Sequence, residues 1–228
     1  MFAGPLFVVS PHLDDAVLSC GATLALHPGS TVCTVFAGKP KQAMSTPWDG
    51  EAGFPDSDVA MMQRYVEDET ALSRCGALGL HLPFLDSQYE NSPTPHDIAD
   101  ALCEAWSCYP GHTFVVPLGL WHSDHVLASD GCFLAAKRIE MLDCVVYEEA
   151  LYRAIPDAVV KRKTALAGEG IAMVRIGDDR LGETSDAYAN AMQKKWHAVS
   201  AYASQLRALH DAHPADVGVP ERFWRPSR

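Results

Sequence analysis

Short apolar runs alternate with longer segments of helical period along much of this chain, and this alternation limits the possible folds more than any other feature. The pattern is typical of βαβ units, in which helices cover the faces of a mostly parallel sheet. We expect strands at residues 6–10, 31–37, 113–117 and 144–147. With 228 residues, the chain has the size of one α/β domain that buries a substantial core.

Two apolar stripes show the helical period most clearly. The first comprises Met61, Tyr65, Leu72 and Cys75, and the second comprises Met192, Trp196, Val199, Ala203 and Leu206. We interpret both as core faces of helices. Two other stretches have no clear period: residues 38–58, rich in Pro and Gly around Trp48, and residues 151–186. We expect long loops there, which serve either as binding loops or as solvated surface.

Charge balance and cysteine usage limit the partners and the cellular setting. The chain has 18 Lys+Arg against 29 Asp+Glu, and its net charge of -11 disfavours nucleic acid and other partners held through phosphates. The seven cysteines include no Cys-x-x-Cys pair, and an odd number cannot all pair within the chain. No signal peptide or membrane-spanning run is apparent. We therefore expect a cytoplasmic protein with free thiols and without a membrane partner.

Reactive side chains first gather directly after the first predicted strand, at residues 10–15 (Ser-Pro-His-Leu-Asp-Asp). Open α/β sheets bind ligands at the carboxyl ends of their strands, so His12, Asp14 and Asp15 lie where a site is expected. The three-residue spacing of His12 and Asp15 allows both to face one metal ion. Alternatively, Asp14 or Asp15 caps the next helix, a position where aspartate is favoured by hydrogen bonding and by the helix dipole.

A second group of such side chains follows the strand predicted at 113–117, in residues 120–125 (Leu-Trp-His-Ser-Asp-His). We expect Ser123 to be the N-cap of a helix, with His122 and His125 one helical turn apart. Both groups then lie at the same edge of the sheet.

This arrangement suits a catalytic zinc ion. Such an ion takes three protein ligands and keeps one open position, and two histidines with one carboxylate are a known ligand set. His12, Asp15 and one of the two later histidines would supply that set.

The motifs resemble those of a known enzyme family. Pro11-His12-Leu13-Asp14-Asp15, with Leu18 and Gly21, resembles the PHxDD signature of the LmbE-like, or PIG-L, N-acetylglucosaminyl deacetylases. Residues 122–125 resemble the HxDH motif of that family, residues 64–68 resemble its RxxE helix, and the region of Asp86 also matches. The resemblance implies one Rossmann-like domain, residues 1–228, with a mostly parallel sheet flanked by helices. Its motifs lie within residues 6–140, and residues 150–228 resemble nothing specific.

The resemblance also implies a role for each matching residue, because members of this family use zinc to hydrolyse the N-acetyl group of glucosamine conjugates. By position, the zinc ligands would be His12, Asp15 and His125. Asp14 would be the general base, and His122 a catalytic histidine beside the carbonyl oxygen.

Arg64 and Asp86 match positions that hold sugar hydroxyls in members of the family. The alternative for Arg64, which we favour less, is an exposed helix residue that pairs with Asp68 at i,i+4. The chain departs from some members at Leu120, where they have a tyrosine that helps to stabilise the oxyanion. The segment Tyr147-Glu148-Glu149 resembles an acidic stretch of some members, but it is too short to assign roles.

Together these residues form a coherent amide hydrolase. Zinc lowers the pKa of a bound water from about 15.7 to about 7 and polarises the amide carbonyl. Asp14 would take the water's proton and pass it to the leaving nitrogen. A protonated His122 would stabilise the negatively charged oxygen, an interaction commonly worth about 3 to 4 kcal/mol. Asp124 would orient a neighbouring histidine through a hydrogen bond rather than bind the metal.

We therefore predict a zinc-dependent hydrolase that removes an acetyl or other acyl group from a small N-acylated amino sugar or related glycoconjugate. Iron or another divalent metal fits the same ligands. Two other functions stay open: a metal-dependent phosphoesterase, since His and Asp also build two-metal sites, and a noncatalytic sugar-binding protein that keeps the pocket. NAD binding and serine-hydrolase chemistry are disfavoured, because Gly-x-Gly-x-x-Gly does not follow the first strand and no Gly-x-Ser-x-Gly occurs.

Overall fold

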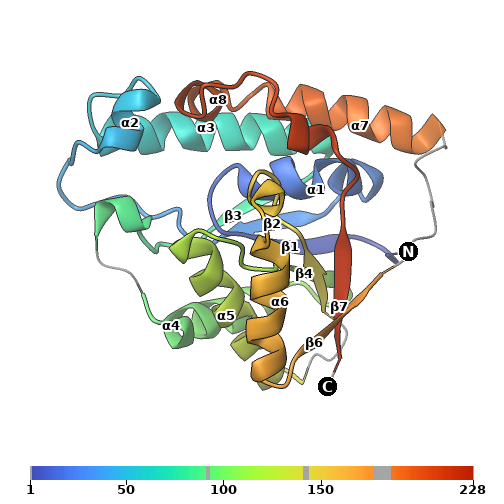
Figure 1. Ribbon diagram of the computed structural model, residues 1–228. Coiled ribbons are helices and arrows are strands. Elements are labelled where there is room, and N and C mark those ends of the chain that lie inside the picture. The colour runs from blue at the N-terminus through green and yellow to red at the C-terminus, as the bar shows by residue number, and fades with distance from the viewer. Residues whose placement is uncertain (1, 91–92, 141–143, 177–185, 228) are drawn as a thin grey trace.

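A central sheet covered by helices on both faces forms the protein (Figure 1). The computed structural model describes residues 2–90, 93–140, 144–176 and 186–227. Within these residues the sheet has seven strands in the order β3-β2-β1-β4-β5-β7-β6. The strands are β1 (Leu6–Ser10), β2 (Thr31–Thr34), β3 (Leu78–His81), β4 (Thr113–Pro117), β5 (Val145–Tyr147), β6 (Ala172–Arg175) and β7 (Phe223–Ser227). The first five are parallel, and β7 runs antiparallel to both β5 and β6.

The helices connect the strands and cover the sheet. They are α1 (Asp15–Leu26), α2 (Pro47–Glu51), α3 (Ser57–Cys75), α4 (Pro95–Trp106), α5 (Ser123–Arg138), α6 (Ala158–Gly168), α7 (Asp186–Val199) and α8 (Ala203–Ala208). Three short 3-10 helices complete the described residues: η1 (Ser87–Tyr89), η2 (Tyr152–Ala154) and η3 (Ala215–Gly218). None of the helices in the described ranges combines the length and apolar character that crossing a membrane requires.

Successive side chains of β1 point to opposite faces of the sheet, and the core accordingly forms two layers. Leu6 and Val8 pack with side chains of α1, α3 and α7 on one face, whereas Phe7 and Val9 pack with side chains of α4 and α5 on the other. Because a strand in the middle of a parallel sheet is buried on both faces, its residues are apolar without interruption. The α/β prediction is confirmed: this is one domain with a mostly parallel sheet flanked by helices.

The four predicted strands are present, although β2 ends at Thr34 rather than at residue 37. The helical stripe of Met61, Leu72 and Cys75 is buried as expected, with Tyr65 half-buried. No disulfide bond joins cysteines in the described part of the chain.

The second stripe is wrong as a continuous helix. The chain leaves helical geometry after Val199, and α8 starts anew at Ala203, which is exposed. Val199 is nevertheless buried in the core, and Trp196 and Leu206 pack against it. Lys195 is buried on α7 as well, where its ammonium pairs with Glu221 at 3.0 Å. The stripe is therefore wrong only in being one helix and at Ala203, and the buried Lys195 is a charged residue that an apolar pattern does not reveal. Of residues 151–186, which we expected to be a loop, the described part instead forms η2, α6 and β6, and residues 177–185 lie outside the described ranges.

Candidate metal centre and active site

Ser10, the last residue of β1, holds the turn into α1. Its hydroxyl donates to the His12 carbonyl at 2.6 Å and accepts from the Ala16 backbone N–H at 3.0 Å. Asp14 occupies the N-cap position of α1, but its side chain makes no capping hydrogen bond. Capping therefore does not explain Asp14, and its carboxylate lines the cavity described below.

His12, Asp15 and His125 converge at the carboxyl edge of the sheet, as the sequence predicts. Asp15 Oδ2 lies 3.1 Å from His12 Nδ1 and 3.1 Å from His125 Nε2. One ligand atom from each residue falls within 4.8 Å of the others, close enough to hold one ion. Both ring nitrogens of His125 are buried, and neither makes a hydrogen bond of good geometry within the described residues. Since buried polar atoms are normally satisfied, the donor set fits a metal ion.

Two further carboxylates orient the histidines. Asp124 Oδ2 accepts from His12 Nε2 at 3.0 Å, which leaves His12 Nδ1 facing Asp15. Glu149 Oε1 lies 3.4 Å from His125 Nδ1, which leaves Nε2 on the side of Asp15. Carboxylates behind ligating histidines fix the ring orientation and increase ligand basicity. The orienting role that we expected of Asp124 is consistent with this geometry.

Glu149 is a residue that the sequence did not assign. Besides facing His125, its Oε1 accepts from the backbone N–H groups of Gly119 at 2.7 Å and of Leu120 at 2.9 Å. Glu149 follows β5, which lies next to β4 in the sheet, and its side chain is buried. The sequence signal that could have identified it is an acidic residue directly after a third parallel strand.

Burial and mutual charge shift the pKa values of this group. Burial raises the pKa of Asp15, but the positive charge of His125 and the hydrogen bond with His12 hold it well below its usual range. Burial lowers the pKa of His125, yet the negative charge of Asp15 and the close approach of the Asp15 and Glu149 carboxylates raise it to about 9. Burial, followed by the charge of Asp15, raises the pKa of Asp14 to about 7. A carboxylate that titrates near neutrality suits proton transfer.

His122 differs from two of our expectations. It is itself the N-cap of α5, in place of Ser123, because its Nδ1 accepts from the Asp124 backbone N–H at 3.2 Å. Burial, followed by the positive charges of His12 and His125, lowers the pKa of His122. This shift favours a neutral ring over the protonated one that we expected. With Nδ1 accepting, the proton lies on Nε2, so a neutral His122 still offers one N–H donor.

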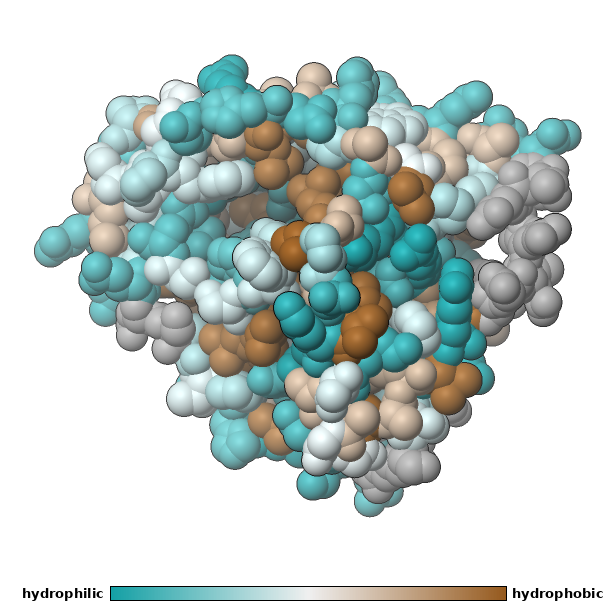
Figure 2. All heavy atoms as spheres, in the orientation of Figure 1, coloured by the Kyte–Doolittle hydropathy of each residue, from teal (hydrophilic) through white to brown (hydrophobic). Residues whose placement is uncertain are grey.

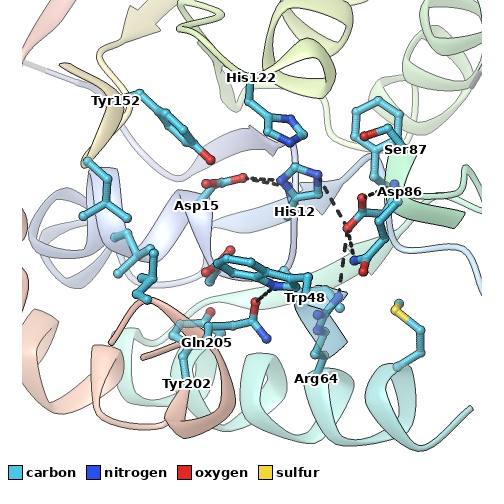
Figure 3. Close-up of a pocket in the computed structure, with 18 residues that line it drawn as sticks. His12, Asp15, Trp48, Arg64, Asp86, Ser87, His122, Tyr152, Tyr202 and Gln205 are labelled. Atoms are coloured by element: carbon cyan, nitrogen blue, oxygen red, sulfur yellow. Dashed lines mark hydrogen bonds and ion pairs between the residues drawn. The ribbon is translucent and has the colours of Figure 1, made fainter. Parts of the chain in front are cut away.

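The ligand cluster opens into a cavity of about 410 Å³. Figure 2 shows a recess on this face of the molecule, between the upper and lower groups of helices of Figure 1. Figure 3 shows His12, Asp15 and His122 along one side of the cavity, with Arg64 and Gln205 on the opposite side. The site therefore has a metal-binding side and a second polar side that faces it.

Arg64 is buried, and an exposed position paired with Asp68 is excluded. Its guanidinium bonds Asp49 at 2.8 Å and lies 4.0 Å from Asp86, and both Arg64 and Asp86 line the cavity. Asp68 instead accepts from the Tyr202 hydroxyl at 2.8 Å. The structure thus places both predicted sugar-binding residues in the cavity.

Two aromatic residues of the cavity have no motif in the sequence. Trp48 precedes Asp49 in α2, and its Nε1–H donates to Gln205 Oε1 at 3.1 Å, which joins α2 to α8. Tyr152 comes from η2 and packs edge-on against His125, with ring centroids 4.6 Å apart. Both lie in the stretches that we expected to be loops.

Solved structures share this fold. The zinc-inhibited form of teicoplanin deacetylase Orf2 has a TM-score of 0.77 and 22% identity, covering 97% of each chain. The A40926 pseudoaglycone deacetylase Dbv21 has a TM-score of 0.73 and 26% identity, covering 98% of this chain and 97% of that one. The N,N'-diacetylchitobiose deacetylase from Pyrococcus horikoshii has a TM-score of 0.52 and 14% identity, covering 89% and 71%. No curated protein matches the chain by sequence.

An α/β sheet with a His–Asp–His group and further carboxylates at its carboxyl edge has the arrangement expected of a metal-dependent hydrolase. The PIG-L family, described as GlcNAc-PI de-N-acetylase, matches residues 7–136, more than half of the chain. This protein belongs to the PIG-L family and is an amide hydrolase that acts on carbon–nitrogen bonds other than peptide bonds.

Proposed function

We propose that this protein is a zinc-dependent deacetylase that removes the acetyl group from an N-acetylated amino sugar carried by a larger glycoconjugate. The observation that carries the proposal is the arrangement of the cavity: His12, Asp14 and Asp15 line it, with His125 buried against Asp15, and Arg64 and Asp86 line the same space. The named activities of the similar structures, on teicoplanin, on A40926 pseudoaglycone and on N,N'-diacetylchitobiose, support this substrate class.

His12 Nδ1, Asp15 Oδ2 and His125 Nε2 would hold the ion, and two histidines with one carboxylate suit zinc. When bound, zinc supplies a Lewis acid that polarises the amide carbonyl and activates the attacking water. Asp124 and Glu149 would keep the two histidine rings in the ligating orientation.

Asp14 accepts a proton from the water as the water oxygen bonds to the carbonyl carbon. It then gives that proton to the nitrogen as the carbon–nitrogen bond breaks, which releases acetate and the free amine. A pKa of about 7 suits a group that must both accept and donate. His122 donates its Nε2–H toward the carbonyl oxygen, where negative charge develops during the attack.

Arg64 and Asp86 would bind sugar hydroxyls. A guanidinium donates and a carboxylate accepts, and a hydroxyl group does both. The cavity of about 410 Å³ falls within the usual range for drug-sized ligands, which suits a sugar with part of its attached group.

A panel of N-acetylated amino sugars and glycoconjugates tests the proposal. We expect acetate release from at least one member of the panel, dependent on about one zinc ion per chain and lost with Asp14→Asn. Hydrolysis by metal-free protein would contradict the zinc assignment. Failure of the zinc-loaded protein to release acetate from every member would contradict the substrate class.

The two alternative functions, a metal-dependent phosphoesterase and a noncatalytic sugar-binding protein, are less consistent with the site. The described residues contain a second possible metal group, His12, His122 and Asp124, but it shares His12 with the first. Two ions would therefore compete for one imidazole, which disfavours a two-metal phosphoesterase. A noncatalytic sugar-binding protein is disfavoured because the chain belongs to a family of amide hydrolases. Phosphate release from a phosphate monoester would overturn the first argument.

A further inference from the structure

Tyr152 lies against the metal-binding group but comes from outside the residues that match the family, 7–136. Its ring packs edge-on against His125 at 4.6 Å between centroids and lies 6.4 Å from the ring of His122. The residue lines the cavity, and Figure 3 shows its hydroxyl pointing toward Asp15. A phenol is thus aimed at the place where the three ligands meet.

The neighbours of Tyr152 fix this position. Leu151 has a φ of +72°, a backbone conformation that is strained for a residue other than glycine, and its N–H donates to Asp216 Oδ2 at 2.7 Å. Arg153 donates from its backbone N–H to the Glu149 carbonyl at 3.0 Å and from Nε to Asp216 at 2.9 Å. Strained backbone that is held by several contacts is typical of functional sites.

The hydroxyl of Tyr152 is unusual among the tyrosines around the site. Tyr89 donates to Asp49, Tyr147 to the Val9 carbonyl, and Tyr202 to Asp68. In the part of the chain that the structure describes, the Tyr152 hydroxyl has no such protein acceptor, although the residue is half-buried. A buried phenol normally finds a hydrogen-bond partner, so one that faces a cavity is available to a ligand.

Few other donors face this side of the cavity. The N–H groups of Gly119 and Leu120 are already donated to Glu149 Oε1, and the Leu120 side chain is apolar and fully buried. His122 contributes one N–H when neutral. An amide oxygen that gains negative charge next to the metal ligands therefore has the His122 ring and the Tyr152 hydroxyl as its nearby donors.

We propose that Tyr152 is a catalytic residue, whose hydroxyl donates a hydrogen bond to the carbonyl oxygen of the scissile amide as that oxygen becomes negatively charged. The inference rests on the proposed deacetylase function, because it assigns a donor to the same amide. The phenol keeps its proton throughout, so no covalent bond to Tyr152 forms or breaks.

Tyr152→Phe is the decisive variant, because it retains the ring against His125 and removes only the hydroxyl. On the N-acetyl substrate that the wild type hydrolyses best, we expect kcat to fall about 10²- to 10³-fold, the effect of losing one oxyanion donor, with KM nearly unchanged. Zinc content should equal that of the wild type. Binding of the methylphosphonamidate of glucosamine, a tetrahedral analogue of the reacting amide, should weaken by a similar factor.

Two further variants separate the hydroxyl from the ring. Tyr152→Ala removes both, and Tyr109→Phe removes a hydroxyl from a half-buried tyrosine that packs on Phe7, in a core away from the cavity. Tyr109→Phe should leave kcat and zinc content unchanged. The inference is overturned if Tyr152→Phe retains wild-type kcat, or if both Tyr152 variants lose zinc. If the zinc-loaded wild type releases no acetate at all, the proposed function fails and the claim for Tyr152 falls with it.

Discussion

The two sides of the cavity are built in different ways. The side with the proposed metal ligands, called the metal-binding side below, comes from turns that directly follow β1 and β4, and its two histidines face the buried carboxylates of Asp124 and Glu149. The opposite side comes from α2, α3 and α8, where Arg64 is held by Asp49 and Trp48 by Gln205. Strand ends give the first side a rigid base, whereas the second depends on contacts between segments far apart in the sequence. Variants on the metal-binding side should therefore change metal binding and kcat, and variants on the other side should change KM.

Asp14 and Asp15 give the sharpest test on the metal-binding side. Asparagine has nearly the shape of aspartate but cannot accept the proton, so Asp14→Asn should keep its zinc and lose about 10²- to 10⁴-fold in kcat. Asp15→Ala should instead lose zinc, because it removes the carboxylate between His12 and His125. Metal analysis and turnover on both proteins distinguish base from ligand. A fully active Asp14→Asn protein would remove the central step of the mechanism.

Glu149 tests whether the orienting carboxylates matter to the metal. Glu149→Gln keeps an oxygen for the N–H groups of Gly119 and Leu120 but removes the charge beside His125, so zinc affinity should fall about 10- to 100-fold. Competition with a chelator measures this affinity. Glu148→Gln is the matched control, because that buried carboxylate pairs with Arg222 rather than with a ligand. Equal affinities in the two variants would contradict the assignment.

Arg64 tests the opposite side. Alanine would leave the buried Asp49 carboxylate unpaired, so Arg64→Lys is the better change: it keeps a charge but loses the planar fork. We expect KM to rise about tenfold with kcat and zinc content nearly unchanged, since a charge-assisted hydrogen bond contributes about 1.5 to 3 kcal/mol. Arg74→Lys, on the exposed end of the same helix, serves as the control. A loss confined to kcat would place Arg64 in the chemical step.

Gln205→Ala should have the smallest effect. It removes the acceptor of the Trp48 N–H and loosens the contact of α2 with α8, at a cost of about 1 kcal/mol, so KM should rise about fivefold. Steady-state kinetics beside Gln63→Ala, an exposed glutamine on α3, would show the difference. If KM does not move, the indole is held by packing alone.

The sequence could predict that His12, Asp15 and His125 converge because the information is local. His12 and Asp15 lie three residues apart after an apolar strand, and the second motif follows another strand, so parallel-sheet geometry alone brings them to one edge. Glu149 likewise follows a strand, β5, but a single acidic residue after a strand of three residues does not by itself indicate a metal site.

The opposite side could not be predicted in this way. Nothing near Trp48 in the sequence indicates Gln205, and the exposed pairing considered for Arg64 failed because its partner, Asp49, lies in a different helix. The burial of Lys195 could not be predicted for a related reason, since its partner Glu221 lies more than twenty residues away in the sequence. Contacts of this kind depend on the assembled fold rather than on local spacing.

Lys195 has one more consequence, which concerns how sequences of this kind can change over time. Its stem crosses α1 at Gly21, where a Cβ atom would lie 2.7 Å from Lys195 Cγ, and its ammonium reaches Glu221. The same Glu221 carboxylate accepts from the Ala22 and Thr23 N–H groups of α1, the helix that begins with Asp15. Gly21, Lys195 and Glu221 are therefore coupled by packing and charge: a larger residue at 21 would press on the stem of Lys195, and a shorter residue at 195 would leave the carboxylate at 221 without its cation. In related sequences we expect these three positions to covary, so that the C-terminal third cannot be exchanged between lineages independently of the first helix.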